Sequence, residues 1–410
     1  MSEVNELKRG AGVVASSAVG IALGLSPLPF YTLGVFAPHL AQEFGWPMAQ
    51  IMAGLSIMTI MVVLMGPVAG WLADRHGVRR VTLTSLVLFS LAVMTFGLQN
   101  GDIRVYWLTW GLAATVGVGT LPATWTRAIN VWFEARKGLA LGLALTGTGI
   151  AGMLLPGYTH WAIDRFGWRG AYVALALLPL LIALPLSIRY FRATPGQRVD
   201  AQRDEPPSSV GLSFKEAIRD WRFWFIGLAF LPISFAIGGP IPNMKTILST
   251  HGLADTEILS VLPLIGFFVI VGRLAGGWLV DRIWAPLVAA ILLSIPTLLQ
   301  LVLLRDRITV GNAVVLLGGL GLAAGMEYDL LAFLTARYFG TASYSTIYGA
   351  LYSFFAIGAG FASMIYAHIY DLSHTFDRIL MFGSVGMACG ALMLLGLGRY
   401  RYAIAHGARR

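Results

Sequence analysis

The sequence predicts an all-α membrane protein in which twelve transmembrane helices form two pseudo-symmetric bundles of six. Three observations predict this fold class: an apolar composition, a series of long hydrophobic runs, and an internal repeat at half the chain length. Of the 410 residues, 57% are hydrophobic and only 12% are charged, whereas soluble domains carry about a quarter charged residues. Most of the chain therefore needs an apolar solvent.

The hydrophobic runs are long enough to cross a bilayer, since several reach the roughly 20 residues that a spanning helix needs. The first run is too long for the core of a signal peptide, and we interpret it as a retained first span. The expected spans run approximately over residues 11–40, 48–73, 81–98, 105–131, 139–163, 171–190, 223–249, 257–280, 286–304, 312–334, 345–369 and 379–397.

Positive charges are distributed unevenly between the two sides of such a bundle. If both termini lie on one side, 20 of the 29 Lys and Arg residues fall on that side, seven fall on the other, and Arg127 and Arg273 lie within helices. Because cytoplasmic loops are enriched in Lys and Arg, this predicts cytoplasmic termini in a bacterial-type inner membrane. It also accounts for the net charge of +9 without a nucleic-acid partner.

A polar stretch, ATPGQRVDAQRDEPPSSVG, separates the sixth and seventh expected spans. Its prolines and mixed charges are typical of a linker without a core of its own. We therefore expect an N-terminal six-helix bundle at residues 1–194, a cytoplasmic linker at 195–221 and a C-terminal bundle at 222–410. The segment LSFKEAIRDWRFW has the pattern of an interfacial amphipathic helix.

The internal repeat supports two bundles in the same orientation. GWLADR at residues 70–75 recurs as GWLVDR at residues 277–282, with five of six positions identical at an offset of 207 residues. A second match places Trp132 and Phe133 opposite Tyr338 and Phe339. Two six-helix halves, each ending its second helix in an Asp-Arg turn, follow the parallel-repeat plan of some transporters.

The longer segment around the first copy, GPVAGWLADRHGVRR, resembles the loop signature of the major facilitator superfamily. In that signature an Asp at a helix end and basic residues in the following turn latch the cytoplasmic side. The residues to which the resemblance and the repeat assign gating roles are Asp74, Arg75, Arg79, Arg80, Asp281 and Arg282.

Four further segments are similar to the monocarboxylate porter and oxalate/formate antiporter branch: YTLGVFAPHLAQEFGW, RAINVWFEARKGLALG, GRLAGGWLVDR and EYDLLAFLTARYFG. The resemblance implies a secondary active transporter of small organic anions that works by alternating access in the lipid bilayer, and we expect it to function as a monomer. We favour proton-coupled monocarboxylate symport. An organic-anion exchanger of the oxalate/formate type and a drug or metabolite exporter are the alternatives.

Four ionisable residues lie inside the expected spans: Arg127, Arg273, Glu327 and Asp329. A charged side chain at a helix centre costs at least about 2.5–3.5 kcal/mol on insertion scales, so each should face protein or a watery cavity. At the equivalent repeat positions the other half has uncharged residues. Since that half builds the same helix without the charge, the fold alone does not require these residues.

Arg273 lies eight residues before Asp281, which places it about 12 Å inside the cytoplasmic helix end, near the midplane. A guanidinium group matches a carboxylate with a rigid fork and stays charged when buried. The resemblance implies that Arg273 binds the substrate carboxylate. The alternative is a structural ion pair with Glu327 or Asp329.

Glu327 and Asp329 are two residues apart, about 200° around a helix, and we expect them to have different roles. A carboxylic acid in a low-dielectric site can load and release a proton near neutral pH. Glu327 is our first candidate for the proton-coupling acid. Asp329 is the second, because its stripe with Phe333 and Arg337 favours a structural role. The alternative to proton coupling is a purely structural ion pair with Arg127 or Arg337.

Arg127 in the fourth span resembles the span-four arginine of the superfamily, which is linked to proton transfer; the alternative is a packing anchor. Tyr31, Asn243 and Lys245 are candidates for lining the substrate cavity or for interhelical hydrogen bonds. Animal monocarboxylate porters carry a lysine where this chain has Tyr31, and an aspartate where it has Val269. The acid for proton coupling must therefore come from the tenth span.

Signatures of an enzyme or a metal site are missing from the sequence. It has no phosphate-binding glycine loop with lysine, no HExxH motif and no cluster of cysteine and histidine. The single cysteine, Cys389, excludes an intramolecular disulfide. We therefore expect no enzymatic activity, no cofactor and no metal.

Overall fold

The computed structural model describes residues 3–133, 137–191, 211–280, 282–300, 308–340 and 342–402. Within these ranges the side chains of residues 3–9, 67, 74, 127, 130, 131, 137, 138 and 345 are not described. Three predicted site residues are affected. Asp281 lies outside the described residues, and so do the side chains of Asp74 and Arg127.

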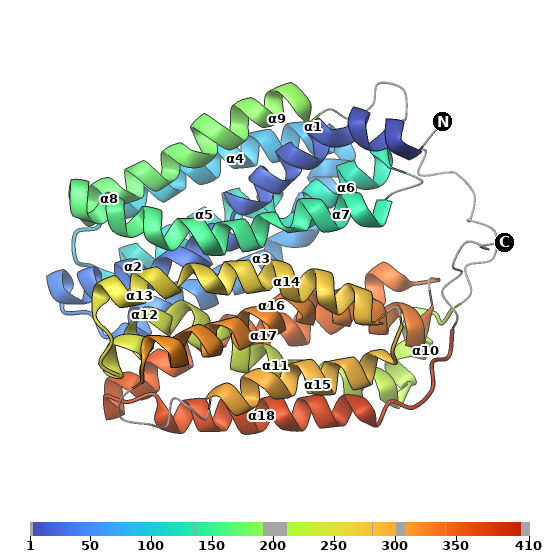
Figure 1. The fold of residues 1–410 in the computed structure, drawn as a ribbon. Coiled ribbons are helices and arrows are strands. Elements are labelled where there is room, and N and C mark those ends of the chain that lie inside the picture. Colours follow the sequence, from blue (N-terminus) through green and yellow to red (C-terminus); the bar gives the residue numbers. More distant parts are fainter. Residues whose placement is uncertain are drawn as a thin grey trace.

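Within the described ranges nine α-helices lie before residue 192 and nine lie after residue 210 (Figure 1). The first set is α1 (Glu3–Ala22), α2 (Pro27–Phe44), α3 (Met48–His76), α4 (Val78–Thr95), α5 (Ile103–Gly117), α6 (Pro122–Trp132), α7 (Lys137–Leu145), α8 (Gly147–Leu178) and α9 (Leu184–Tyr190). The second set is α10 (Phe214–Arg219), α11 (Trp221–Gly238), α12 (Pro240–Thr250), α13 (Asp255–Val261), α14 (Pro263–Val280), α15 (Ala285–Gln300), α16 (Val310–Phe339), α17 (Tyr344–Ser373) and α18 (Asp377–Leu395).

The helices are long and apolar enough to make this a multi-pass membrane protein. Among the residues that the structure describes, nine helical segments could cross a membrane. One of them, Leu139–Tyr190, contains two expected spans, which non-helical backbone at Gly167 (φ 68°) separates. The fourth expected span is broken between α5 and α6, and the ninth corresponds to α15 with 16 residues. The count of twelve crossings therefore stays a prediction.

Helix breaks occur where proline or glycine interrupts the expected spans. The first span divides between α1 and α2 just before Pro27, and the seventh divides at Gly239, before Pro240. The break in the fourth span, a 3₁₀ turn at Val118–Thr120 followed by Pro122, was not expected from the sequence. Proline is tolerated at these positions because the first turn of a helix needs no backbone donor.

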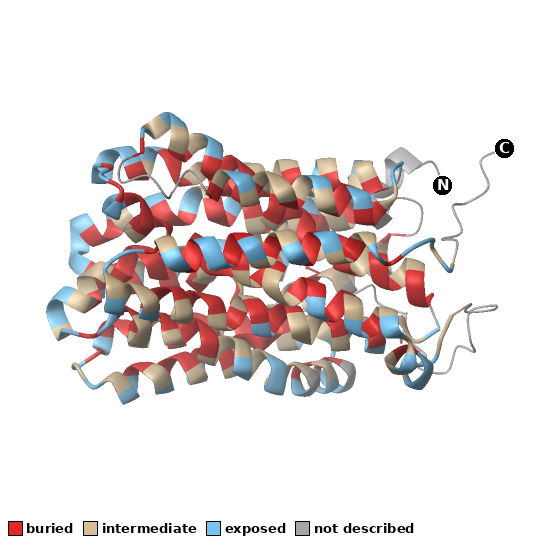
Figure 2. Cartoon of the chain, turned by 90° about the horizontal axis from the view of Figure 1, so that it is seen from below, coloured by how far each residue is buried: buried red, intermediate tan, exposed pale blue. Residues whose placement is uncertain are grey.

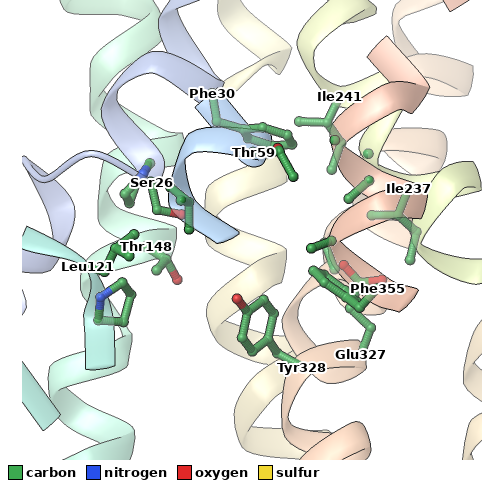
Figure 3. Close-up of a pocket in the computed structure, with 18 of the residues that line it drawn as sticks. Ser26, Phe30, Thr59, Leu121, Thr148, Ile237, Ile241, Glu327, Tyr328 and Phe355 are labelled. Carbon is green, nitrogen blue, oxygen red and sulfur yellow. The ribbon is translucent and has the colours of Figure 1, made fainter. Parts of the chain in front are cut away.

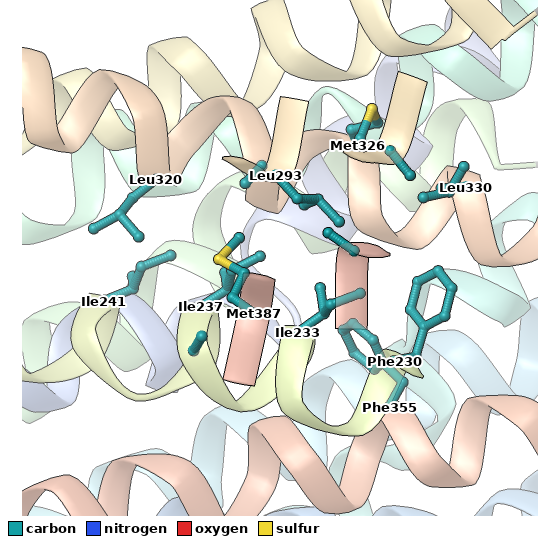
Figure 4. Packing of buried hydrophobic residues seen from close by; sticks show 14 of the residues in the cluster. Phe230, Ile233, Ile237, Ile241, Leu293, Leu320, Met326, Leu330, Phe355 and Met387 are labelled. Atoms are coloured by element: carbon teal, nitrogen blue, oxygen red, sulfur yellow. The ribbon is translucent and has the colours of Figure 1, made fainter. Parts of the chain in front are cut away.

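Buried apolar residues form separate cores in the two halves. One large cluster consists of residues from Ala217 to Leu397, contributed mainly by α11 and α14–α18; Figure 4 shows part of its packing. The other two clusters come from residues before the linker, apart from Ala367 on α17. Two cores divided at the linker agree with two bundles, although the expected boundaries at 194–195 and 221–222 stay a prediction.

The outer surface of the bundle is also apolar. Buried and exposed residues alternate along the helices (Figure 2), and many exposed residues are large and hydrophobic, including Leu108 at 72% and Leu181 at 67% exposed. A soluble monomer rarely exposes so much contiguous apolar surface. The exterior therefore suits contact with lipid.

The two copies of the sequence repeat share one local contact, an arginine stacked on a tryptophan. At the end of α3 the guanidinium carbon of Arg75 lies 5.5 Å from the ring centroid of Trp71, and after α14 that of Arg282 lies 4.1 Å from the ring of Trp278. Both tryptophans are more than half exposed. Tryptophan and arginine in this arrangement are typical of the membrane–water interface.

The two ends of the molecule differ in how the halves pack. α1 begins and α18 ends at the end on the right of Figure 1, which we call the terminal end. The contact between the halves lies at the other end, which we call the opposite end. At the opposite end the carboxylate of Asp371, in the last turn of α17, accepts hydrogen bonds from the backbone N–H groups of Met48 (3.0 Å) and Ala49 (2.8 Å). A carboxylate at the N-terminus of α3 also interacts favourably with the helix dipole.

Glycines allow the two backbones to approach closely between this contact and the middle of the molecule. A Cβ on Gly34 would overlap the carbonyl oxygen of Pro242, and one on Gly266 would overlap that of Gly149. Ser56 also donates to the carbonyl of Gly360 at 2.7 Å. We call this set of contacts, together with Asp371, the opposite-end seal.

The terminal end has a different packing. Gly66 and Gly70 on α3, Gly277 on α14 and Gly349 on α17 have no described neighbour within 4 Å of the position that a Cβ would take. At the opposite end the two halves are therefore in close contact, whereas these four glycines near the terminal end border open space.

The start of the C-terminal half is fixed by a capping box. The backbone N–H and the hydroxyl of Ser213 both donate to Glu216 at 2.8 Å, which begins α10 in the segment expected to be interfacial. These hydrogen bonds hold the pKa of Glu216 below its usual value. The linker thus ends in a short, capped helix.

The first testable prediction concerns the seal. Asp371→Asn should weaken the bond to α3 by about 1–2 kcal/mol, or roughly tenfold in population, because a charge-assisted acceptor becomes neutral. We expect faster labelling of a Val35→Cys probe by a membrane-impermeant thiol reagent, in a Cys389→Ser background. Asp371→Glu is the control that keeps the charge. Equal labelling of the Asp371→Asn and parent proteins would show that this contact does not hold the seal.

Candidate functional site

A cavity of about 230 Å³ lies between the two halves. Its wall from the first half comes from α2, α3 and the breaks near α6 and α7, and its wall from the second half comes from α11, α12, α14, α16 and α17. Figure 3 shows Ser26, Leu121 and Thr148 on one side and Glu327, Tyr328 and Phe355 on the other. Three of the four ionisable residues predicted within spans, Arg273, Glu327 and Asp329, line it.

The breaks in the helices coincide with the cavity. Ser26 and Pro27 at the start of α2, Leu121 and Pro122 before α6, and Leu145 at the end of α7 all line its wall. Irregular backbone at membrane depth is tolerated where it borders a cavity, since its polar groups can find partners there. The breaks therefore provide backbone polar groups at the site.

Arg273 joins the two halves across the cavity. Its Nη1 donates to the carbonyl oxygen of Leu145 at 2.7 Å, from α14 to the break between α7 and α8. Its Nε lies 3.2 Å from Oδ2 of Asp329 on α16. The Arg273 side chain is only 10% exposed. Within the described structure its charge is compensated by the carboxylate of Asp329 and the carbonyl oxygen of Leu145.

Asp329 forms the ion pair with Arg273 that the sequence analysis gave as an alternative. Its stripe with Phe333 and Arg337 favoured a structural role along α16, and Arg337 does stack over Phe333 at 5.1 Å. The carboxylate of Asp329, however, faces Arg273 and the cavity. The close packing of α14 on α16 explains this, because Gly272 and Gly325 allow the two backbones into contact beside the ion pair.

Glu327 is the most buried carboxyl group of the site, with 6% of the residue exposed. Its Oε2 has no hydrogen-bond partner among the described residues. Glu327 and Asp329 both line the cavity even though they lie about 200° apart around α16. The two carboxyl groups reach the cavity from different sides of α16, and of the two only that of Asp329 contacts Arg273.

The three other predicted lining residues have different positions. Tyr31 lines the main cavity and a second, smaller one, which Lys245 also lines. Nζ of Lys245 lies 3.7 Å from Asp255 at the start of α13. Asn243 lines neither cavity: it is fully buried and its Nδ2 donates to the carbonyls of Gly239 (2.9 Å) and Ser363 (3.2 Å). These bonds fit the alternative of interhelical packing.

Four predicted gating residues that the structure describes, Arg75, Arg79, Arg80 and Arg282, lie at the terminal end, away from the cavity. Nη2 of Arg79 donates to the carbonyl of Ile188 at 2.6 Å within the first half. Arg75 and Arg282 stack on their own tryptophans, as described above. Arg80 is on α4 next to Arg79. The gating role of these residues, of Asp74 and of Asp281 stays a prediction.

An aromatic group in the cavity was missed by the sequence analysis. The hydroxyl of Tyr328 donates to that of Tyr352, and the ring of Phe355 lies 4.8 Å from that of Tyr328. Tyr344, Tyr348 and Tyr352 continue along α17 with stacked rings 5.8 and 6.2 Å apart. Their four-residue spacing places them on one helix face, which is the signal that could have found them.

The structure shows no group of three or more His, Cys, Asp or Glu side chains that could hold a metal ion within its described ranges. The arrangement instead combines a compensated arginine, a second carboxyl group and an apolar wall, which suits reversible binding of an organic anion.

The sequence profile of the Major Facilitator Superfamily matches residues 19–363. The chain belongs to the major facilitator superfamily. Solved structures agree on the fold of this superfamily member: a bacterial homologue of the human lysosomal transporter Spinster, in an inward-facing and unoccupied conformation, superposes with a TM-score of 0.65 at 17% identity and 96% coverage of both chains. The predicted family, fold and transporter class are thereby confirmed.

Among curated proteins, the chain is 28% identical to the "Uncharacterized 38 kDa protein in 23S RNA operon" of Thermoproteus tenax, over 90% of this chain and 92% of that protein. It is 29% identical to Monocarboxylate transporter 11 of Mus musculus, over 68% of this chain and 61% of that protein. It is 23% identical to the "Probable sulfoacetate transporter SauU" of Cupriavidus necator, over 88% of both.

The second prediction tests the pair of Arg273 and Asp329. Arg273→Gln and Asp329→Asn should each lower the thermal midpoint of the purified protein, because each leaves a partner charge uncompensated. The double variant should recover part of the loss, with a coupling energy of about 1 kcal/mol, since the half-exposed Asp329 is partly screened. Simple additivity of the two single effects would show that the ion pair contributes nothing.

Proposed function

We propose that this superfamily member is a proton-coupled symporter of organic carboxylates, with Arg273 as the anion-binding group. The observation that carries the proposal is the position of Arg273, a permanently charged fork in a cavity between the two halves. Transporters of this architecture bind their substrates at that interface. The names of two relatives, a monocarboxylate transporter and a probable sulfoacetate transporter, are those of organic-acid carriers.

The orientation follows from the excess of positive charge at the terminal end. We infer that this end faces the cytoplasm of a bacterial-type cell, that both termini lie there, and that residues 1–194 and 222–410 move as the two bundles of a functional monomer. The seal at the opposite end and the open packing at the terminal end then correspond to an inward-open state. Gating would bring Asp74, Asp281 and the basic residues near them together at the cytoplasmic end.

Glu327 is the proposed proton carrier. An ionised carboxylate that is buried without hydrogen bonds is costly, so protonation of Glu327 and access of water to the cavity are coupled. Its neighbours in the cavity include Tyr328 and Tyr352. Arg273 forms its ion pair with Asp329 and not with Glu327. Asp329 stays the second candidate for the coupling acid, and Arg127 stays a candidate for a part in proton transfer.

Asp329 favours net transport over exchange. When an empty carrier reorients, an uncompensated arginine would have to cross in a low-dielectric environment, which is unfavourable. Asp329 supplies a carboxylate in place of the substrate, so the empty carrier can return. An exchanger of the oxalate/formate type does not have to return empty, so it does not need Asp329 for this step. A drug exporter does not need a fixed anion-binding site.

The third prediction tests the anion site. Arg273→Lys keeps the charge but cannot hold Asp329 and the Leu145 carbonyl with separate atoms or present a fork to a carboxylate. We expect uptake of labelled pyruvate into proteoliposomes to fall at least about tenfold, and methyl pyruvate to be unable to compete with pyruvate. Near-normal affinity in Arg273→Lys would exclude this residue as the carboxylate ligand.

The fourth prediction separates symport from exchange. Glu327→Gln resembles the permanently protonated acid in size and hydrogen bonding but cannot release a proton. Uptake driven by a pH gradient should therefore collapse, whereas counterflow should persist and lose its pH dependence. Loss of both activities would assign Glu327 to the fold.

Asp329→Asn is the matched comparison. It should also reduce net uptake, because the empty carrier cannot return with an unpaired arginine. Its counterflow, however, should keep the pH dependence of the parent. If Glu327→Gln keeps full uptake driven by a pH gradient, then either Asp329 carries the coupled proton or the protein is not a proton symporter.

A further inference from the structure

The two walls of the cavity differ in polarity, and this difference bears on the substrate of the proposed carboxylate transporter. The described charged side chains of the cavity, Arg273, Glu327 and Asp329, all belong to the second half. The facing wall of the first half is built largely from apolar side chains, among them Leu25, Leu55, Met58, Val62 and Leu121. A bound anion would thus have its charge on one side and its body against the other.

Two of the hydroxyl groups on the first-half wall are already engaged. Thr59 donates to the carbonyl of Leu55 at 3.0 Å, and Thr148 donates to that of Leu145 at 2.9 Å. Thr59 thus donates within α3, as is common for threonine, and Thr148 donates from α8 to the last residue of α7. These two groups therefore offer a substrate no hydrogen-bond donor.

Aromatic rings form the shelf next to the charged groups. Tyr328, Tyr352 and Phe355 pack with ring centroids 4.8 to 5.4 Å apart, and the two tyrosine hydroxyls bond to each other. This bond uses the hydroxyl hydrogen of Tyr328, and the three rings present apolar faces and edges. Aromatic pairs in such geometries gain more than their buried area alone provides.

The size of the cavity also favours a bulky occupant. Its volume of about 230 Å³ is many times the roughly 10–15 Å³ that one water molecule needs. A two- or three-carbon acid bound to Arg273 would leave most of the apolar wall in contact with water, whereas a larger apolar body would displace that water.

We propose that the preferred substrate is an organic acid with a bulky apolar body, best an aromatic ring, lying between Met58 on α3 and the shelf of Tyr328, Tyr352 and Phe355. The carboxylate meets Arg273 and replaces Asp329. The row formed by Tyr352, Tyr348 and Tyr344 then extends the same aromatic surface along α17 toward the terminal end. This inference rests on the proposed function and narrows its substrate class.

The test compares acids that differ only in the apolar body. Purified full-length protein in detergent is titrated with acetate and phenylacetate, and with pyruvate and phenylpyruvate, and thermal stabilisation reports binding without the complication of passive membrane leak. Each phenyl acid should reach half-maximal stabilisation at a concentration at least about tenfold lower than its small partner. Phenylacetamide, which lacks the charge, should give no stabilisation. Equal or tighter binding of acetate and pyruvate would overturn the inference.

Variants of α3 locate the apolar body. Met58→Trp is designed to fill the proposed space for the ring beside the shelf. It should weaken the binding of phenylacetate at least about tenfold more than the binding of acetate. Ile60→Trp adds the same side chain to the exposed face of α3, 43% exposed in this structure, and should leave both responses unchanged. If Met58→Trp does not fold, Val62→Phe tests the same wall one turn further along. A parallel weakening of both acids would place the ring elsewhere and overturn the inference.

Arg273→Gln distinguishes this inference from the proposed function. If it abolishes the response to every acid while acetate and pyruvate bind best, the carboxylate site stands and the apolar substrate class falls. If no acid stabilises the protein, or if stabilisation is unaffected by Arg273→Gln, the proposed function itself fails.

Discussion

One electrostatic constraint organises the centre of this molecule: a guanidinium group that cannot lose its charge lies within a membrane-spanning bundle. Its burial requires permanent compensation, which Asp329 and the carbonyl of Leu145 provide from two different helices. The close glycine packing of α14 on α16 brings the carboxylate within reach, and the break between α7 and α8 supplies the carbonyl. The position of the cavity, the breaks around it and the contact between the halves are all linked to this one charge.

The sequence predicted the fold well because hydrophobic runs, charge asymmetry and the Gly-Trp-Leu repeat are local signals. It identified three ionisable residues that share the cavity, since a charge in an apolar run is conspicuous wherever it points. It did not predict which carboxylate would meet Arg273. The stripe of Asp329, Phe333 and Arg337 describes one helix only, whereas the partner of Asp329 depends on how tightly α14 approaches α16.

The positions that were missed share a different property. The break before Pro122 resembles the prolines noticed in other spans, but its effect depends on the 3₁₀ turn that precedes it. Tyr328 and Tyr352 are uncharged, so an apolar run conceals them, and only the packing of α16 beside α17 makes them a pair. Asp371 was overlooked because it lies at a helix end, where acidic residues are unremarkable until the start of α3 is placed next to it.

The glycines of the opposite-end seal place a mechanical condition on this superfamily member. Where Gly34 meets Pro242, and Gly149 meets Gly266, backbone lies directly on backbone, so there is no side chain whose rotation could open a passage. Separation must move whole helices, a collective motion on a scale of about microseconds to milliseconds rather than the nanoseconds of a rotamer change. The rate at which the seal opens is therefore set by backbone packing between helices.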